Sequence, residues 1–85
     1  MYPYKTIFVA NDEIMGKNIA YLRKKKRISR KLFAEMMGMT NLSLKCIEQG
    51  RIYEIPLLAF MNIFKFFDLE PATLLDIDLN KRDAL

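Results

Sequence analysis

Residues 28–51, ISRKLFAEMMGMTNLSLKCIEQGR, decide the fold that the sequence predicts. They contain two N-cap residues, Ser29 and Thr40. About one short helix further along, each is followed by a glycine that can end a helix without steric cost, Gly38 and Gly50. This pattern predicts two short helices, Ser29 to Met37 and Thr40 to Gln49, joined by a turn that contains a glycine. Two such helices form a helix-turn-helix unit.

Each of the two expected helices has one apolar face. Phe33, Ala34 and Met37 share a face of the first helix, whereas Leu44 and Ile47 face inward from the second. This assignment leaves the remaining side chains of the second helix for solvent or a groove: Asn41, Leu42, Ser43, Lys45, Cys46 and Gln49.

The flanking sequence predicts three more helices. They are expected from Asn11 or Asp12 to about Lys26, from Pro56 to about Phe67, and from Glu70 and Pro71 onward with Leu74 and Leu75 facing in. Residues 4–9, YKTIFV, are rich in β-branched and aromatic side chains, which is typical of a strand. A chain of 85 residues is therefore expected to form one all-α domain of five helices with an N-terminal strand-like segment.

The opening stretch resembles the helix-turn-helix core of the lambda-repressor-like family (Xre/Cro/C1 type), whose usual pattern reads roughly LSQEELAELLGVSRSTISRIERGK. Ala34, Gly38, Glu48 and Gly50 are in register with that pattern. Upstream, MGKNIAYLRKKK is similar to the first helix of the family, and downstream PLLAFMNIFKFFDLEPATLL is similar to its fourth and fifth. The resemblance covers residues 14–76 and implies a DNA-binding domain there, with an N-terminal extension at 1–13 and a C-terminal tail at 77–85.

The resemblance implies that the third helix of the chain enters the major groove while the second crosses the phosphate backbone. The residues then expected to contact DNA are Arg30, Lys31, Thr40, Asn41, Leu42, Ser43, Lys45, Cys46 and Arg51. Asn41 suits the N6/N7 edge of adenine, and Lys45 and Arg51 suit phosphate. Leu42 and Cys46 depart from the family pattern, since apolar groups can touch a thymine methyl but cannot hydrogen-bond a base edge.

The resemblance also implies a structural ion pair between Arg23 and Glu48. Basic residues are concentrated around Arg23: of the 14 in the chain, which has a net charge of +4, seven lie between residues 23 and 31. The acidic residues are more frequent in the last third. Such an asymmetry is typical of a small domain that places one face on a polyanion, although a solvated lysine-rich helix end would look similar.

The stretch at residues 57–67, LLAFMNIFKFF, is apolar nearly all round, which indicates a helix covered on two sides. The core is expected to take Leu57, Phe60, Met61, Phe64 and Phe67. Leu58 and Phe66 then form a second stripe, which together with the strand-like segment predicts a homodimer interface made of Tyr4, Ile7, Phe8, Val9, Leu58 and Phe66. The alternative is that the strand folds back over Leu58 and Phe66 within one chain.

Several classes of function are not expected. The chain has no histidine and a single cysteine, Cys46, so it offers neither a zinc-ligand set nor a nucleophile with a base, and we expect no metal, no cofactor and no enzymatic activity. It has neither an apolar run of about 20 residues nor a secretory signal, which predicts a cytoplasmic protein without a membrane partner. No small-molecule ligand is expected, because 85 residues leave no room for a separate sensing domain.

Two functions fit these observations. The first is sequence-specific binding of double-stranded DNA by a small transcriptional regulator, a repressor of phage, mobile-element or antitoxin type, which binds its operator as a homodimer. The second is a protein-interaction module that keeps the helix-turn-helix scaffold and binds through Leu42, Cys46, Ile52 and Ile55. The basic residues favour the first function, whereas the apolar residues on the recognition helix favour the second.

Overall fold

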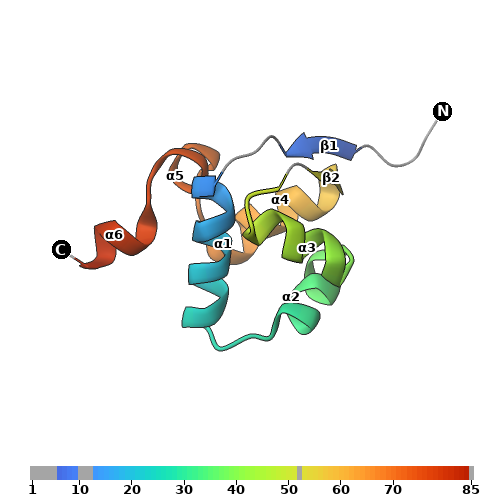
Figure 1. Ribbon diagram of the computed structural model, residues 1–85, viewed down its shortest axis with the longest axis horizontal. Coiled ribbons are helices and arrows are strands. Elements are labelled where there is room, and N and C mark those ends of the chain that lie inside the picture. Colours follow the sequence, from blue (N-terminus) through green and yellow to red (C-terminus); the bar gives the residue numbers. More distant parts are fainter. Residues whose placement is uncertain (1–5, 10–12, 52, 85) are drawn as a thin grey trace.

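Six helices and two short strands make up residues 6–9, 13–51 and 53–84, the part of the chain that the computed structural model describes (Figure 1). In chain order they are β1 (Thr6–Val9), α1 (Glu13–Lys25), α2 (Arg30–Met37), α3 (Asn41–Glu48), β2 (Tyr53–Pro56), α4 (Leu57–Phe67), α5 (Pro71–Asp76) and α6 (Leu79–Ala84). The all-α class is confirmed. The predicted count of five helices is wrong, because residues 79–84 form a sixth.

Helices α2 and α3 begin and end where the sequence predicts. The side chain of Ser29 caps α2 by accepting a hydrogen bond from the backbone N–H of Leu32, and the side chain of Thr40 caps α3 by accepting one from Ser43. Gly38 ends α2 with φ of 82°, in the left-handed region that glycine adopts without steric cost. Three residues therefore separate the two helices, as in a helix-turn-helix unit.

Helix α1 crosses α3 at very short range. A Cβ atom on Gly16 would overlap the carbonyl oxygen of Ile47, so only glycine fits at this point of α1. On either side of the crossing, the buried side chains of Met15 and Ile19 belong to the same apolar cluster as Leu44 and Ile47. The close approach thus fixes the position of α3 against the core.

Helix α4 turns a different face to the core from the one that we expected. Its fully buried residues are Ala59 and Ile63, whereas Met61, expected inside, is exposed. Phe66, expected on the outer stripe, instead packs edge-on against Phe33 with ring centroids 5.6 Å apart. The side chain of Asn62 also faces α2, where its amide donates to the carbonyl of Met37 over 3.0 Å. Because nearly every position of this helix is apolar, hydrophobic periodicity could not identify its inner face.

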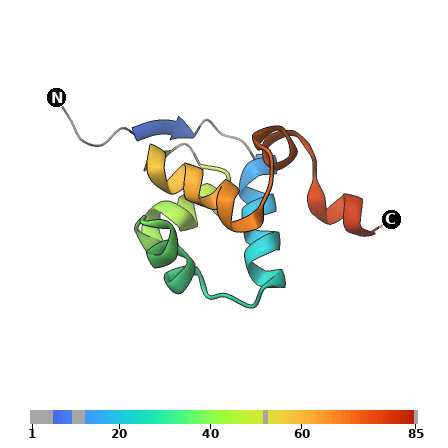
Figure 2. The ribbon, with the colours of Figure 1, turned by 180° about the vertical axis from the view of Figure 1, so that it is seen from behind.

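Helix α6 is attached to α1 by a buried amide. Asn18 Nδ2 donates to the carbonyl oxygens of Leu74 and Ile77, over 2.6 and 2.7 Å, and Asn18 Oδ1 accepts from the backbone N–H of Leu79 over 2.9 Å. Leu79 itself is fully buried. These contacts explain why a polar segment, LNKRDA, is helical where the sequence predicted a tail. From either side, α6 is seen at one end of the molecule, beyond α1 and α5 (Figures 1 and 2).

The predicted N-terminal strand is present as β1, which pairs antiparallel with β2 of the same chain. Thr6 lies opposite Pro56, and Val9 lies opposite Tyr53. β2 leads directly into α4 and contacts it (Figure 1). Tyr4 lies outside the described residues, and the structure describes only the backbone of 6–9, so the dimer contacts expected of Tyr4, Ile7, Phe8 and Val9 stay predictions. The described residues leave Leu58 largely uncovered, with 66% of its surface exposed.

Candidate nucleic-acid interface

An ion pair holds α3 in place from behind. Arg23 of α1 forms two hydrogen bonds to Glu48, one from Nε to Oε2 over 2.7 Å and one from Nη2 to Oε1 over 3.0 Å. A third bond joins Arg23 Nη1 to the carbonyl of Ile28, over 2.8 Å. The side chains of Arg23 and Glu48 are only 7% and 3% exposed. The predicted pair is confirmed, and Arg23 is therefore a structural residue with no free charge for a ligand.

Arg30 joins the same network. Its Nε lies 3.1 Å from Glu48 Oε1, so both oxygens of this carboxylate are bound by guanidinium groups. Because Arg23, Arg30 and Glu48 belong to α1, α2 and α3, one carboxylate connects all three helices. The side chain of Arg30 is half-buried, so the contact that we expected it to make with DNA competes with an internal bond.

The outer face of α3 is narrower than the sequence predicts. Ser43 and Cys46, both expected to face a groove, are each only 6% exposed. The hydroxyl of Thr40 donates to Ser43 Oγ over 2.8 Å, and α3 contacts β2 as well as α1 and α2. A helix with neighbours on three sides buries more than a single stripe, and this is why the assignment of Ser43 and Cys46 to the outer face is wrong.

The exposed residues of α3 gather at its first turn and along one side. Asn41 and Lys45 are exposed, and Leu42 between them keeps 58% of its surface in solvent. Gln49 and Arg51, just beyond the end of the helix, are exposed as well. None of these five side chains has a hydrogen bond or an ion pair to another described residue. Two amides, an apolar group and two cations are thus available together for an external partner.

The basic residues from Arg23 to Lys31 divide into paired and unpaired ones. Besides the two arginines bound to Glu48, Lys25 lies 3.4 Å from Asp83, and the ammonium of Lys26 lies 5.6 Å from the ring centre of Phe66. Within the described chain, three have no hydrogen bond, ion pair or aromatic-ring contact from the side chain: Lys24, Arg27 and Lys31. Arg27 was not among the expected DNA contacts. It ends α1 with φ of 59°, and this turn leaves its side chain exposed.

A small cluster at the surface connects α6 to the basic end of α1. Tyr21 donates a hydrogen bond from its hydroxyl to Asp83 Oδ2 over 2.6 Å. This bond is the main reason why the pKa of Asp83 lies below its ordinary value and that of Tyr21 above it. A hydrogen bond to Asp83 likewise raises the pKa of Lys25. The charge of Lys25 is thus partly balanced within the fold.

Among residues 6–9, 13–51 and 53–84, no group of three or more histidine, cysteine, aspartate or glutamate side chains is placed to hold a metal ion. In the same part of the chain, no helix has the length and apolar character that crossing a membrane requires. Comparison with family models, with curated proteins and with solved structures finds no match to this chain.

Proposed function

We propose that this protein binds double-stranded DNA as a small transcriptional regulator with a lambda-repressor-like fold, and that α3 is its recognition helix. The observation that carries the proposal is the contrast around Glu48: the back of α3 is fixed to α1 and α2, whereas its outer side presents Asn41, Leu42 and Lys45 without internal hydrogen bonds or ion pairs. A recognition helix needs both properties, because base contacts require a fixed backbone and free side chains.

Each exposed residue has a role that its chemistry supports. The amide of Asn41 can donate to and accept from the N6/N7 edge of adenine, and Leu42 can pack against a thymine methyl. Arg27, Lys31, Lys45 and Arg51 are cations for the phosphate backbone on both sides of α3. Ser43 and Cys46 have no part in this proposal because they are buried.

The number of available cations sets the expected salt dependence. Each phosphate contact contributes about −0.9 to the slope of log K against log[salt], so four contacts give a slope of about −3 to −4. A slope near −5 would indicate about two further phosphate contacts, which Arg30 and Lys25 could supply by leaving Glu48 and Asp83.

A fluorescence-anisotropy titration against fragments of the source genome, at three or more salt concentrations, tests the proposal. Asn41→Ala should narrow the affinity difference between specific and random sequences, at a cost of about 1–3 kcal/mol on the specific one. Lys31→Ala should weaken binding to all sequences about equally and reduce the slope by about one. Lys65→Ala, an exposed lysine of α4, is the matched control and should change neither quantity. Binding that does not depend on salt would contradict the proposal.

A two-fold homodimer would place two copies of α3 about 34–36 Å apart, in successive turns of the major groove. Its support within the described chain is the exposed pair Leu58 and Met61, one turn apart on α4. Sedimentation equilibrium should show a dimer that Leu58→Lys converts to a monomer. A monomer at the highest soluble concentration of the unmodified protein would contradict this assembly.

A second candidate function, a protein-interaction module, is supported by a different observation. Leu32 and Met36, four residues apart on α2, are exposed, as is Leu42 on α3. Of the four residues first assigned to this function, Cys46 is buried, Ile52 lies outside the described residues and the side chain of Ile55 is not described, which leaves Leu42. The two functions separate experimentally, since Leu32→Ala should weaken binding to a protein partner and leave DNA affinity unchanged.

A further inference from the structure

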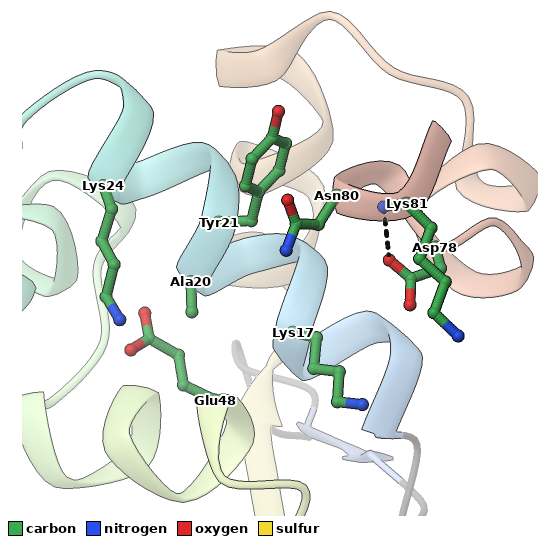
Figure 3. A pocket seen from close by; sticks show the side chains of 8 residues that line it. All are labelled: Lys17, Ala20, Tyr21, Lys24, Glu48, Asp78, Asn80 and Lys81. Atoms are coloured by element: carbon green, nitrogen blue, oxygen red, sulfur yellow. Dashed lines mark hydrogen bonds between the residues drawn. The ribbon is translucent and has the colours of Figure 1, made fainter. Parts of the chain in front are cut away.

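A cavity of about 490 Å³ opens between α1 and α6, and none of the residues proposed to contact DNA lines it (Figure 3). This volume is within the range of small-molecule sites, about 300–1,000 Å³. Three lysines line the cavity: Lys17 and Lys24 from α1, and Lys81 from α6. All three side chains are exposed, and none forms an ion pair with a described residue.

The two acidic residues of the cavity do not balance the lysines. Both oxygens of Glu48 are bound by Arg23 and Arg30, so the charge of this carboxylate is compensated within the fold. Asp78 accepts a hydrogen bond from the backbone N–H of Lys81 over 3.1 Å, and its negative charge has no basic partner among the described residues. Three ammonium groups thus face one uncompensated carboxylate, and the cavity carries a positive potential.

The spacing of the lysines selects an elongated anion. Lys17 and Lys24 are seven residues apart on one helix, which places their backbone positions about 10 Å apart along the axis. Figure 3 shows Ala20 between them and the amide of Asn80 directed from α6 toward this face of α1. A chain of two or three phosphates offers each lysine its own phosphate, and the amide of Asn80 can donate to its middle, whereas a single phosphate or sulfate would require both flexible side chains to be ordered toward one point.

We propose that this cavity binds the polyphosphate group of a small molecule. The lysines of α1 would hold its two ends, and Lys81 would close the site from α6. Because the site shares no residue with the proposed DNA contacts, this inference goes beyond the proposed function and stands independently of it. It also differs from the expectation, drawn from chain length, that no small-molecule ligand binds.

The test is a titration of the full chain with inorganic triphosphate, monitored by the amide signals of isotope-labelled protein at constant ionic strength. Saturable shifts should concentrate at Ala20, Asn80 and Lys81. Lys17→Gln and Lys24→Gln should each weaken binding about two- to five-fold, as expected for one exposed charge pair, whereas the control Lys65→Gln should leave it unchanged. A parallel titration with ATP shows whether the nucleoside is recognised as well. If ATP and triphosphate bind with equal affinity, the site recognises the phosphate chain alone; if ATP binds more tightly, the site also contacts the nucleoside.

A variant that should bind triphosphate more tightly tests the same proposal if a lysine variant folds poorly. Asp78→Asn removes the uncompensated negative charge but retains a good capping side chain for α6, so it should tighten binding about two- to five-fold. The proposal is overturned if the shifts grow without saturation, if sulfate at the same ionic strength competes as well as triphosphate, or if Lys65→Gln weakens binding as much as Lys17→Gln.

Discussion

The inner and outer faces of α3 are built under different constraints. The inner face is fixed by the close approach of Gly16 to Ile47, by the buried pair of Arg23 with Glu48, and by the burial of Leu44. On the outer face, Asn41, Leu42 and Lys45 contact solvent and no other described side chain by hydrogen bond or ion pair. We therefore expect substitutions on the inner face of α3 to change the free energy of unfolding, and substitutions on the outer face to change binding, so that the two effects can be separated.

The largest loss of stability is expected at Glu48, the charged residue on the inner face of α3. Glu48→Gln leaves the guanidinium of Arg23 buried without a counter-charge, and breaking a buried pair in this way costs about 3–5 kcal/mol. Urea denaturation followed by circular dichroism measures the loss. Glu35→Gln, an exposed residue of α2, is the control and should shift the free energy of unfolding by less than about 0.5 kcal/mol. Equal effects of the two substitutions would show that the network does not hold α3.

A slightly smaller effect is expected at the crossing of α1 and α3. Gly16→Ala introduces a Cβ that meets the backbone of Ile47, which cannot move as a side chain can, and should cost about 3 kcal/mol, the upper end for overpacking. Gly38→Ala is the matched control: nothing lies near its added Cβ, and only its left-handed conformation opposes alanine, at about 1–2 kcal/mol. If Gly38→Ala proved the more damaging, the helices would not be in close contact at Gly16.

The outer face should respond in the opposite manner. Leu42→Ala should leave the free energy of unfolding within about 0.5 kcal/mol of the unmodified protein, because its side chain is largely in solvent. If Leu42 packs on a thymine methyl, the substitution should lower DNA affinity about five-fold, equivalent to about 1 kcal/mol, without changing the salt slope. Anisotropy titration at two salt concentrations measures the DNA affinity and the salt slope, and urea denaturation measures the free energy of unfolding. A loss of stability with unchanged affinity would remove the distinction between the faces.

The smallest effect concerns Asp83, whose carboxylate lies at the surface beside α1. Its pKa is lowered in the folded state, mainly by the hydrogen bond from Tyr21, so its contribution to stability is present above its ordinary pKa and is lost as the pH falls through the lowered value. Tyr21→Phe should return the pKa of Asp83 toward its ordinary range in a carboxyl-detected NMR titration. An unchanged pKa would show that the hydrogen bond does not form in solution.

The helix-turn-helix unit could be predicted from the sequence because its signals are local. Ser29 and Thr40 cap the helices that follow them, and Gly38 makes the turn, so each boundary depends on a residue within one turn of itself. The inner face of α4 could not be predicted in the same way. Its apolar side chains surround the helix, and the choice of Ala59 and Ile63 for the core depends on neighbours that are distant in sequence.

The same distinction between local and distant contacts applies to the candidate site. The pair of Arg23 with Glu48 was implied by a family resemblance. The burial of Ser43 and Cys46 accompanies the packing of α3 against α1, α2 and β2, and the cavity is formed by residues of α1, α6 and their neighbours. Neither of these arrangements leaves a periodic pattern in the sequence. Gly16 is a further case, because a glycine within a helix gives no sign of which backbone passes near it. The one available signal was that glycine destabilises the interior of a helix, so that its presence there indicates a close contact that a larger residue would prevent.

The bond between Asn18 and Leu79 has a consequence for how the chain folds. It closes a loop of 61 residues, far longer than the contacts that form α2, its turn and α3. Loop closure of this length costs entropy that local contacts avoid, so the order of events should run from the helix-turn-helix unit outward, with α6 added last. During synthesis on the ribosome, the amide of Asn18 can therefore form its bond to Leu79 only after the 61 residues that follow Asn18 have emerged.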